Sequence, residues 1–172
     1  MRALLLAALL LPAARPARAD DAPKVQRYLA DLRLGDDLET VRRVYPPARE
    51  WPGSSSGGGD MVRYRVERSW AKAFPRDAQT LFVGFLRGRL VEIEIVYGSR
   101  LSARQPVDKL AGEYALIYGE PRRTAERFWW ADDRTVLRVF PVEVPARKAG
   151  PRAVEIRTGV QVFDRRAFER RK

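Results

Sequence analysis

The sequence predicts an α+β domain in which an antiparallel sheet of about six strands carries two main helices on one face. Six segments have strand signals, and in three of them, 61–70, 90–97 and 152–163, residues alternate between two faces with the period of a β-strand. Two other segments have apolar residues at helical spacing. Their order is helix, three strands, helix, three strands, so an α-β-β-β tandem duplication is a further possibility. The chain has 172 residues, and one domain over 20–172 fits the expected length of a single core.

The first 19 residues have the pattern of a secretory signal. Arg2 precedes an apolar run over 3–11, and Ala17-Arg18-Ala19 matches a small-residue cleavage site. The run is too short to span a bilayer, and no other segment is apolar for long enough. We therefore expect cleavage after Ala19 and a periplasmic or secreted bacterial protein with no transmembrane segment.

Helical spacing and capping residues predict the helices. A short helix is expected over 24–32. The first main helix begins near Asp36, which forms a D-x-x-E capping signature with Glu39, and ends before Pro46. The second main helix covers 105–118, and Gly119 stops it.

The strands are separated by turn-forming residues. A flexible Gly/Ser loop is expected at 52–60, and Gly88 marks the turn of a hairpin in which Leu90, Glu92 and Glu94 share one strand face. The chain closes with a basic tail at 165–172, where a further short helix is possible. The predicted strands cover 61–70, 80–86, 90–97, 125–130, 135–144 and 152–163.

Composition excludes several kinds of chemistry. The chain has no Cys and no His, so it has no disulfide, no thiolate or imidazole metal ligand and no Ser-His-Asp triad. No cofactor and no metal are predicted. The net charge is +11, but Arg and Glu alternate along the strands as on a solvated sheet face. Together with the export signal, this pattern argues against nucleic acid as the partner.

Aromatic residues next to charged residues form the main candidate binding site. Strand alternation places Trp129 and Trp130 on opposite faces, so one of them leaves the core side unless the far face is covered. Trp beside Arg is typical of protein interfaces, although such a pair can also serve only to stabilise the sheet. The candidate binding residues are Trp129, Trp130, Arg63, Arg65, Glu92, Glu94 and Arg138.

Two alternative functions remain open on the sequence. The basic tail could contact anionic lipid or polysaccharide through Arg165, Arg166, Arg170, Arg171 and Lys172. Glu92 and Glu94 lie about 7 Å apart on one strand face, given a rise of about 3.3 Å per residue, and could form the carboxylate pair of a hydrolase.

Two segments resemble known bacterial envelope domains. Leu34-Gly35-Asp36 through Tyr45-Pro46 resembles the opening helix of BamE/SmpA-type domains. Tyr118-Gly119-Glu120-Pro121, followed by Trp130 through Thr135, resembles a pattern of periplasmic proteins, and the doubled layout over about 30–165 is similar to the beta-lactamase-inhibitor-protein-like fold. The resemblance implies a non-catalytic module that binds or assembles another envelope protein.

Overall fold

A computed structural model describes residues 23–55, 61–146 and 153–169. The predicted signal peptide at 1–19 lies outside these residues, as do Arg170, Arg171 and Lys172 of the tail and residues 56–60 of the Gly/Ser loop. Within the described ranges, no helix is long and apolar enough to cross a membrane.

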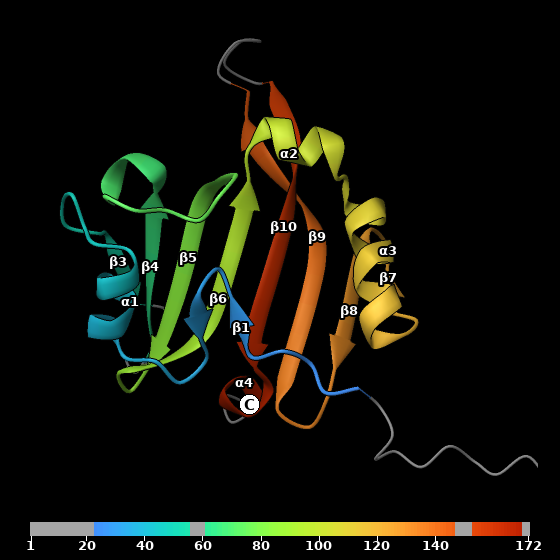
Figure 1. Cartoon of the computed structure of the whole chain (residues 1–172), viewed down its shortest axis with the longest axis horizontal. Helices are drawn as coiled ribbons and strands as arrows, with labels where there is room; N and C mark the ends of the chain where they lie inside the picture. Colours follow the sequence, from blue (N-terminus) through green and yellow to red (C-terminus); the bar gives the residue numbers. More distant parts are fainter. Residues whose placement is uncertain (1–22, 56–60, 147–152, 170–172) are drawn as a thin grey trace, which may run out of the picture.

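The centre of the molecule is an eight-stranded antiparallel sheet with the strand order β3-β4-β5-β6-β10-β9-β8-β7 (Figure 1). A separate two-stranded sheet pairs β1 (Tyr28–Leu29) with β2 (Leu32–Arg33). The strands of the large sheet are β3 (Gly53–Ser55), β4 (Met61–Glu67), β5 (Ala78–Leu86), β6 (Arg89–Tyr97), β7 (Arg122–Thr124), β8 (Arg127–Ala131), β9 (Thr135–Pro145) and β10 (Val154–Asp164).

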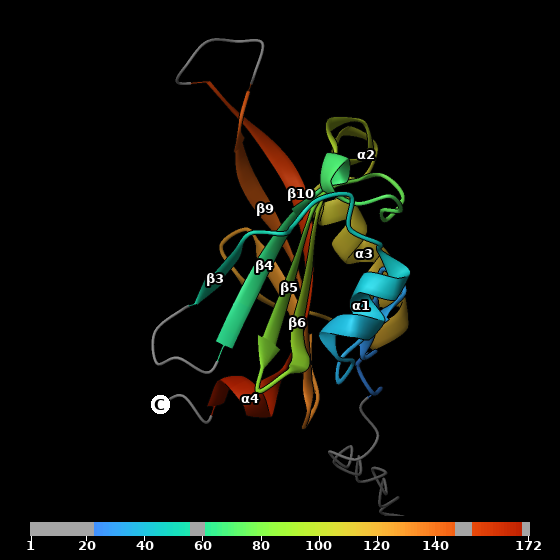
Figure 2. The same ribbon diagram turned by 90° about the vertical axis from the view of Figure 1, so that its left-hand side faces the viewer.

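The helices divide the molecule into layers. Figure 2 shows α1 (Leu38–Val44) and α3 (Val107–Tyr118) on one face of the sheet, together with the β1–β2 hairpin. Helix α2 (Ser99–Arg104) lies at one end of the sheet, beside the 3₁₀ turn η2 (Arg68–Trp70). Helix α4 (Arg165–Glu169) projects at the opposite end, on the other side.

The core forms between the sheet and these helices. Leu81, Ile93 and Val160 are fully buried because alternate residues of each strand point to the helical side. On the second half of the sheet, the ring of Trp130 packs 5.9 Å from that of Tyr114 on α3. The Trp130 indole N–H also donates to the Gly119 carbonyl at 2.8 Å, so burial leaves this polar group satisfied.

The predicted fold of six strands and two main helices is wrong. Within the described residues, the chain forms eight strands in one sheet, two in another, and four short helices. The additional strands β3 and β7 are three-residue edge strands made of exposed Gly, Ser, Arg and Thr, which show no apolar alternation. As a result, α1 and α3 are each followed by a meander of four strands rather than three, and the two meanders meet where β6 pairs with β10.

Two expected helices also differ from the prediction. Residues 24–32 contain part of a hairpin whose turn residues Ala30 and Asp31 both have positive φ, as two-residue hairpin turns require. The expected helix at 105–118 begins only at Val107, and a separate helix, α2, precedes it. The break falls at Pro106, because a residue before proline disfavours the helical conformation.

The first main helix begins one residue later than predicted. The Asp37 carboxylate, not that of Asp36, accepts a hydrogen bond from the Thr40 backbone N–H at 2.8 Å. This hydrogen bond lowers the pKa of Asp37. Asp36 instead accepts from the Arg33 backbone N–H at 2.8 Å and holds the preceding turn.

A β-bulge between β5 and β6 changes the face of the sheet to which Leu90 points. The pairing of β5 and β6 shifts between Gly84 and Phe85, so Gly84 faces Glu92 whereas Phe85 faces Leu90. The extra residue, Val91, reverses the alternation. Leu90 therefore joins the core at 1% exposure, instead of sharing a face with Glu92 as predicted.

Candidate functional site

The side of the sheet opposite α1 and α3 carries a continuous row of polar and aromatic side chains. Pairing places these residues directly opposite one another on six adjacent strands. Paired residues of an antiparallel sheet project to the same side, so the row lies on one surface, which we call the open face. The row consists of Arg65, Phe82, Glu94, Gln161, Arg138 and Trp129.

Arg63 joins two carboxylates near the centre of the open face. Its Nη2 lies 2.8 Å from Glu94 Oε2 and 3.2 Å from Glu92 Oε1. The side chains of Glu92 and Glu94 are only 6% and 12% exposed. The guanidinium also packs over the Phe82 ring, 4.1 Å from its centroid. The two carboxylates have little contact with solvent, so Arg63 is needed to stabilise their negative charge. Removing one partner of such a pair leaves an uncompensated buried charge.

Gln161 holds the same two carboxylates from β10. Its amide nitrogen donates to Glu92 Oε1 at 2.7 Å and to Glu94 Oε2 at 3.2 Å. Two carboxylates therefore share one cation and one amide. Burial raises the pKa of Glu94; the Arg63 charge opposes this shift, and the nearby Glu92 charge adds to it. The Glu94 carboxylate is therefore protonated more easily than that of an ordinary Glu.

Positive charge and a hollow lie beside this cluster. Arg138 packs over the Phe163 ring at 4.5 Å, and burial together with the Arg127 charge lowers the pKa of Arg138. A hollow of about 200 Å³ is lined by Glu94, Arg127, Arg138, Phe140 and Gln161. A second hollow of about 550 Å³ shares Glu94, Arg127 and Phe140 and continues along β9. The depression combines charged and apolar walls.

The two neighbouring tryptophans lie in different environments. Trp129 is half-buried on the open face, opposite Arg138, whereas Trp130 is 4% exposed and belongs to the core. Of the seven predicted binding residues, Trp130 alone lies away from the open face, because the strand alternation directs it toward α3. Its place in the core makes it a structural residue rather than an available anchor.

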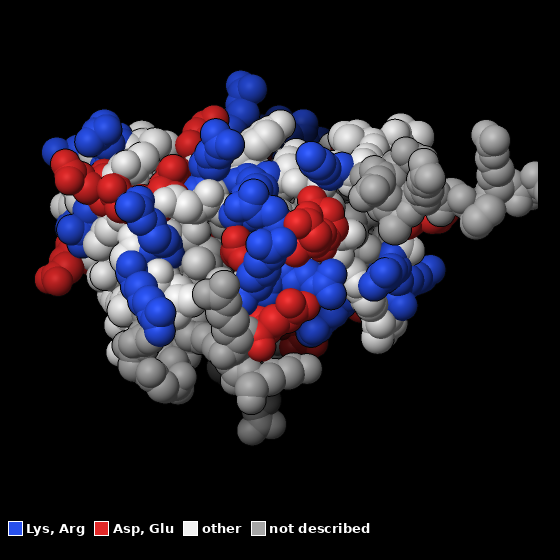
Figure 3. All heavy atoms as spheres, turned by 90° about the horizontal axis from the view of Figure 1, so that it is seen from below, with Lys and Arg blue, Asp and Glu red and all other residues white. Residues whose placement is uncertain are grey.

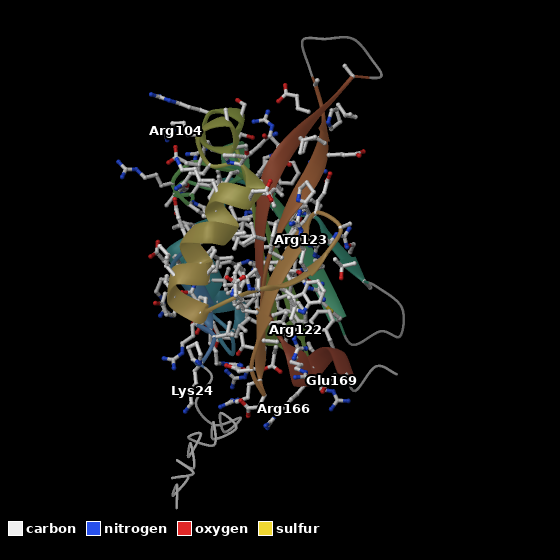
Figure 4. The ribbon with its side chains drawn as sticks, turned by 90° about the vertical axis from the view of Figure 1, so that its right-hand side faces the viewer. Lys24, Arg104, Arg122, Arg123, Arg166 and Glu169 are labelled. Atoms are coloured by element: carbon white, nitrogen blue, oxygen red, sulfur yellow. The ribbon has the colours of Figure 1, made fainter. Side chains whose placement is uncertain are left out.

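The two described arginines of the basic tail are paired within the protein. Arg165 Nε lies 2.6 Å from Glu169 Oε1, and Arg166 Nη2 lies 3.1 Å from Asp133 Oδ2. Figure 3 shows basic and acidic side chains intermixed on the end of the molecule that carries α4, and Figure 4 labels Arg166 and Glu169 there. The proposed contact with anionic lipid or polysaccharide remains a prediction.

Sequence reasoning missed four residues of the open face, namely Phe82, Phe140, Gln161 and Phe163. Strand parity alone could have placed each on the polar side of its own strand. Phe82 meets Glu94 within the β5–β6 hairpin, whereas the association of the other three with Glu92 and Glu94 depends on the pairing of β6 with β10, which are far apart in the chain. In the described part of the chain, no group of three or more acidic side chains is arranged to hold a metal ion.

The chain matches no protein-family model, no curated protein and no solved structure. The comparisons therefore provide no link to the BamE/SmpA-type or beta-lactamase-inhibitor-protein-like families. The functional argument rests on the geometry of the open face.

Proposed function

We propose that this protein is a non-catalytic module of the bacterial envelope that binds another protein through the open face of its sheet. The observation that supports this proposal is the row from Arg65 to Trp129, which crosses six strands and is covered by no helix of the described residues. The envelope location rests on the predicted signal at residues 1–19.

The surface has the composition of an interface rather than of an ordinary solvated sheet. Half-buried aromatic side chains, Phe82, Phe140 and Trp129, alternate with Arg138 and the buried carboxylates. Aromatic and Arg residues dominate the energetic centres of protein interfaces. In Figure 2 the ends of β9 and β10 and helix α4 lie on the same side of the sheet as this face.

The same geometry gives the carboxylates a structural task. Glu92 and Glu94 are both held by Arg63 and Gln161, so they fix the polarity and shape of the face. A hydrolase that used this pair would lose turnover in Glu92→Gln and show a bell-shaped pH profile. A binding module would have no such turnover to lose.

The direct test is capture of a partner from envelope extract by crosslinking, at low and high salt. We expect a discrete protein that survives high salt with the native chain and is lost with Trp129→Ala, since truncating an aromatic hot spot costs about 2 kcal/mol or more, roughly 30-fold in affinity. Trp130 is unsuitable for this test because its removal damages the core.

A matched control comes from the helical side. Leu116 on α3 is 89% exposed, and Leu116→Ala removes apolar surface away from the open face. Partner capture that is unchanged by Trp129→Ala, or equally reduced by Leu116→Ala, would contradict the proposal. Capture of lipid or polysaccharide alone, released by salt, would instead favour the basic tail.

A further inference from the structure

Arg157 is a buried cation with incomplete hydrogen bonding. It lies on β10 and is 9% exposed. Its Nη2 pairs with Glu155 Oε2 at 2.5 Å, but Nε and Nη1 are buried and have no acceptor among the residues that the structure describes. A guanidinium carries five N–H donors, and leaving buried charged donors unpaired is costly. Two donor atoms of Arg157 therefore lack an acceptor. Both are closed to solvent, so an oxyanion in a neighbouring cavity would reach them through a small shift of the guanidinium.

Arg157 lines a cavity at one end of the sheet. This cavity, of about 600 Å³, lies at the end of the sheet between η2 and the start of α2, at the top of Figure 1. Ser69, Gln79 and Ser99 also line it and provide neutral hydrogen-bonding groups. We call it the α2 cavity. It is separate from the two hollows on the open face, with which it shares no lining residue.

The charged residues that line the cavity have a small excess of positive charge. Three arginines and two acids, Glu67 and Asp77, line the α2 cavity. Glu67 is already paired with Arg65 at 2.6 Å. Arg68 donates to the carbonyls of Pro75 and Ala78, which fixes its position.

Arg100 supplies the uncommitted charge of the cavity. It is exposed at the start of α2, and no ion pair joins it to another residue in the described ranges. The wall of the cavity thus contains a buried guanidinium, two of whose donor atoms have no acceptor, and the rim carries a second guanidinium that is exposed to solvent. Arginine is suited to carboxylate and phosphate groups because its donors match their oxygens.

We infer that the α2 cavity binds a small organic oxyanion, a carboxylate or a phosphate ester, with Arg157 as the buried anchor and Arg100 at the rim. The volume leaves room for an organic part beside the anionic group, and Leu101 and Ala78 provide apolar wall for it. This site would operate independently of the open face, so the failure of one proposal leaves the other standing.

The test is calorimetric titration of the purified chain with inorganic phosphate, glycerol 3-phosphate and succinate, at constant ionic strength in chloride. We expect saturable binding at one site by at least one of these probes, and a Tm that rises with probe concentration above Kd. The arm with the highest affinity distinguishes a phosphate from a carboxylate ligand. Weak heats that are equal for all three probes and do not saturate would overturn the inference.

Variants locate the site. Arg157→Met keeps the length of the side chain and removes the donors, and we expect at least about tenfold weaker binding. Arg100→Gln should weaken binding by a smaller factor, and it decides the question should Arg157→Met fail to fold. The matched control is Arg104→Gln, which removes the same charge from α2 at an exposed position outside the cavity (Figure 4).

The pattern across the variants is decisive. Affinity lost in Arg157→Met and reduced in Arg100→Gln, but kept in Arg104→Gln, would support the α2 cavity. Equal loss in Arg100→Gln and Arg104→Gln would show attraction to the general charge of α2, and full affinity in a folded Arg157→Met would show binding elsewhere. Either of the last two results would overturn the assignment.

Discussion

Arg63 is the residue on which the charge balance of the open face depends. It pairs with two carboxylates that are each almost fully buried, while its own side chain remains 30% exposed. Replacement by Met keeps the packing over Phe82 but leaves both carboxylates with Gln161 as their common partner.

We expect Arg63→Met to lower the free energy of unfolding at pH 7 by about 2 kcal/mol. This is less than the roughly 3–5 kcal/mol lost when a fully buried pair is broken, because Arg63 keeps solvent contact. The loss should shrink at acidic pH, where the Glu94 carboxylate, whose pKa is raised by burial, becomes protonated. Urea unfolding at pH 4 and pH 7 measures both quantities, with Arg65→Met as a control, since Arg65 is 60% exposed. A loss that is the same at both pH values would contradict the argument.

The raised pKa of Glu94 predicts a second pH effect. The native protein binds this proton more tightly than the unfolded chain, so stability falls as the pH rises from 4.5, the ordinary Glu value, through the raised value. Glu94→Gln removes this term, while Arg63 keeps Glu92 as its ion-pair partner. We expect the variant to gain stability relative to the native chain between pH 4 and pH 7.

Thermal unfolding across this pH range provides the measurement. Glu126→Gln is the control, because it removes one carboxylate at an exposed position that lines the adjoining hollow. Its pH dependence should follow that of the native chain. A Glu94→Gln curve parallel to the native curve would exclude the proposed effect of burial.

At the scale of single residues, the sequence predicted which side chains carry charge on each strand but not how they meet. Arg63, Glu92 and Glu94 followed from alternation within β4 and β6. Their contact with Gln161 depends on β10, which is joined to β6 by long-range pairing that no local pattern specifies. The burial of Trp130 rather than Trp129 likewise depends on which side α3 covers.

At the scale of elements, Gly112 and Gly84 differ in the space available for a side chain. A Cβ added to Gly112 in α3 would approach no neighbouring element within 4 Å among the described residues, whereas a Cβ on Gly84 would lie 2.7 Å from Met61 Cε and 3.0 Å from Glu92 Cβ. Gly84 therefore permits the close approach of β5 to the side chain of Glu92.

We expect Gly112→Ala to raise the free energy of unfolding by about 0.8 kcal/mol, because Ala loses less backbone entropy in a helix. Gly84→Ala should lower it by about 1–3 kcal/mol, because the added methyl group overpacks the site. Chemical denaturation of both variants checks the pair. Equal effects of the two substitutions would contradict this interpretation of the space around them.

The sequence predicted some of these elements and missed others, for reasons that lie in their residue patterns. Long strands with an apolar face, such as β5 and β6, lie where alternation indicates them. The edge strands β3 and β7 contain exposed Gly, Ser, Arg and Thr, whose pairing comes from their neighbours and not from their own pattern. The β1–β2 hairpin was missed because its turn uses Ala30 and Asp31 at positive φ, where Asn or Gly is the usual signal.

At the scale of the whole molecule, the two four-stranded meanders share one core. β6 and β10 pair over five residues at the junction, and the buried side chains of Ile93, Ile95, Val160 and Val162 lie along it. The hydrophobic core cluster includes residues from both meanders and from both α1 and α3. Neither meander has a separate core, so the halves should unfold together.

The tryptophans allow this to be measured, because Trp51 and Trp70 lie in the first half and Trp129 and Trp130 in the second. One variant carries Phe at the first pair and the other carries Phe at the second, so fluorescence reports a single half in each. We expect the urea midpoint seen by fluorescence in each variant to coincide with the midpoint seen by circular dichroism, as for a two-state domain.

Val160→Ala, made in both backgrounds, should lower the free energy of unfolding by about 2 kcal/mol in each. That loss shifts both midpoints together by roughly 1 M urea. Fluorescence that departs from circular dichroism, or a shift confined to one half, would show that the junction joins two independent units.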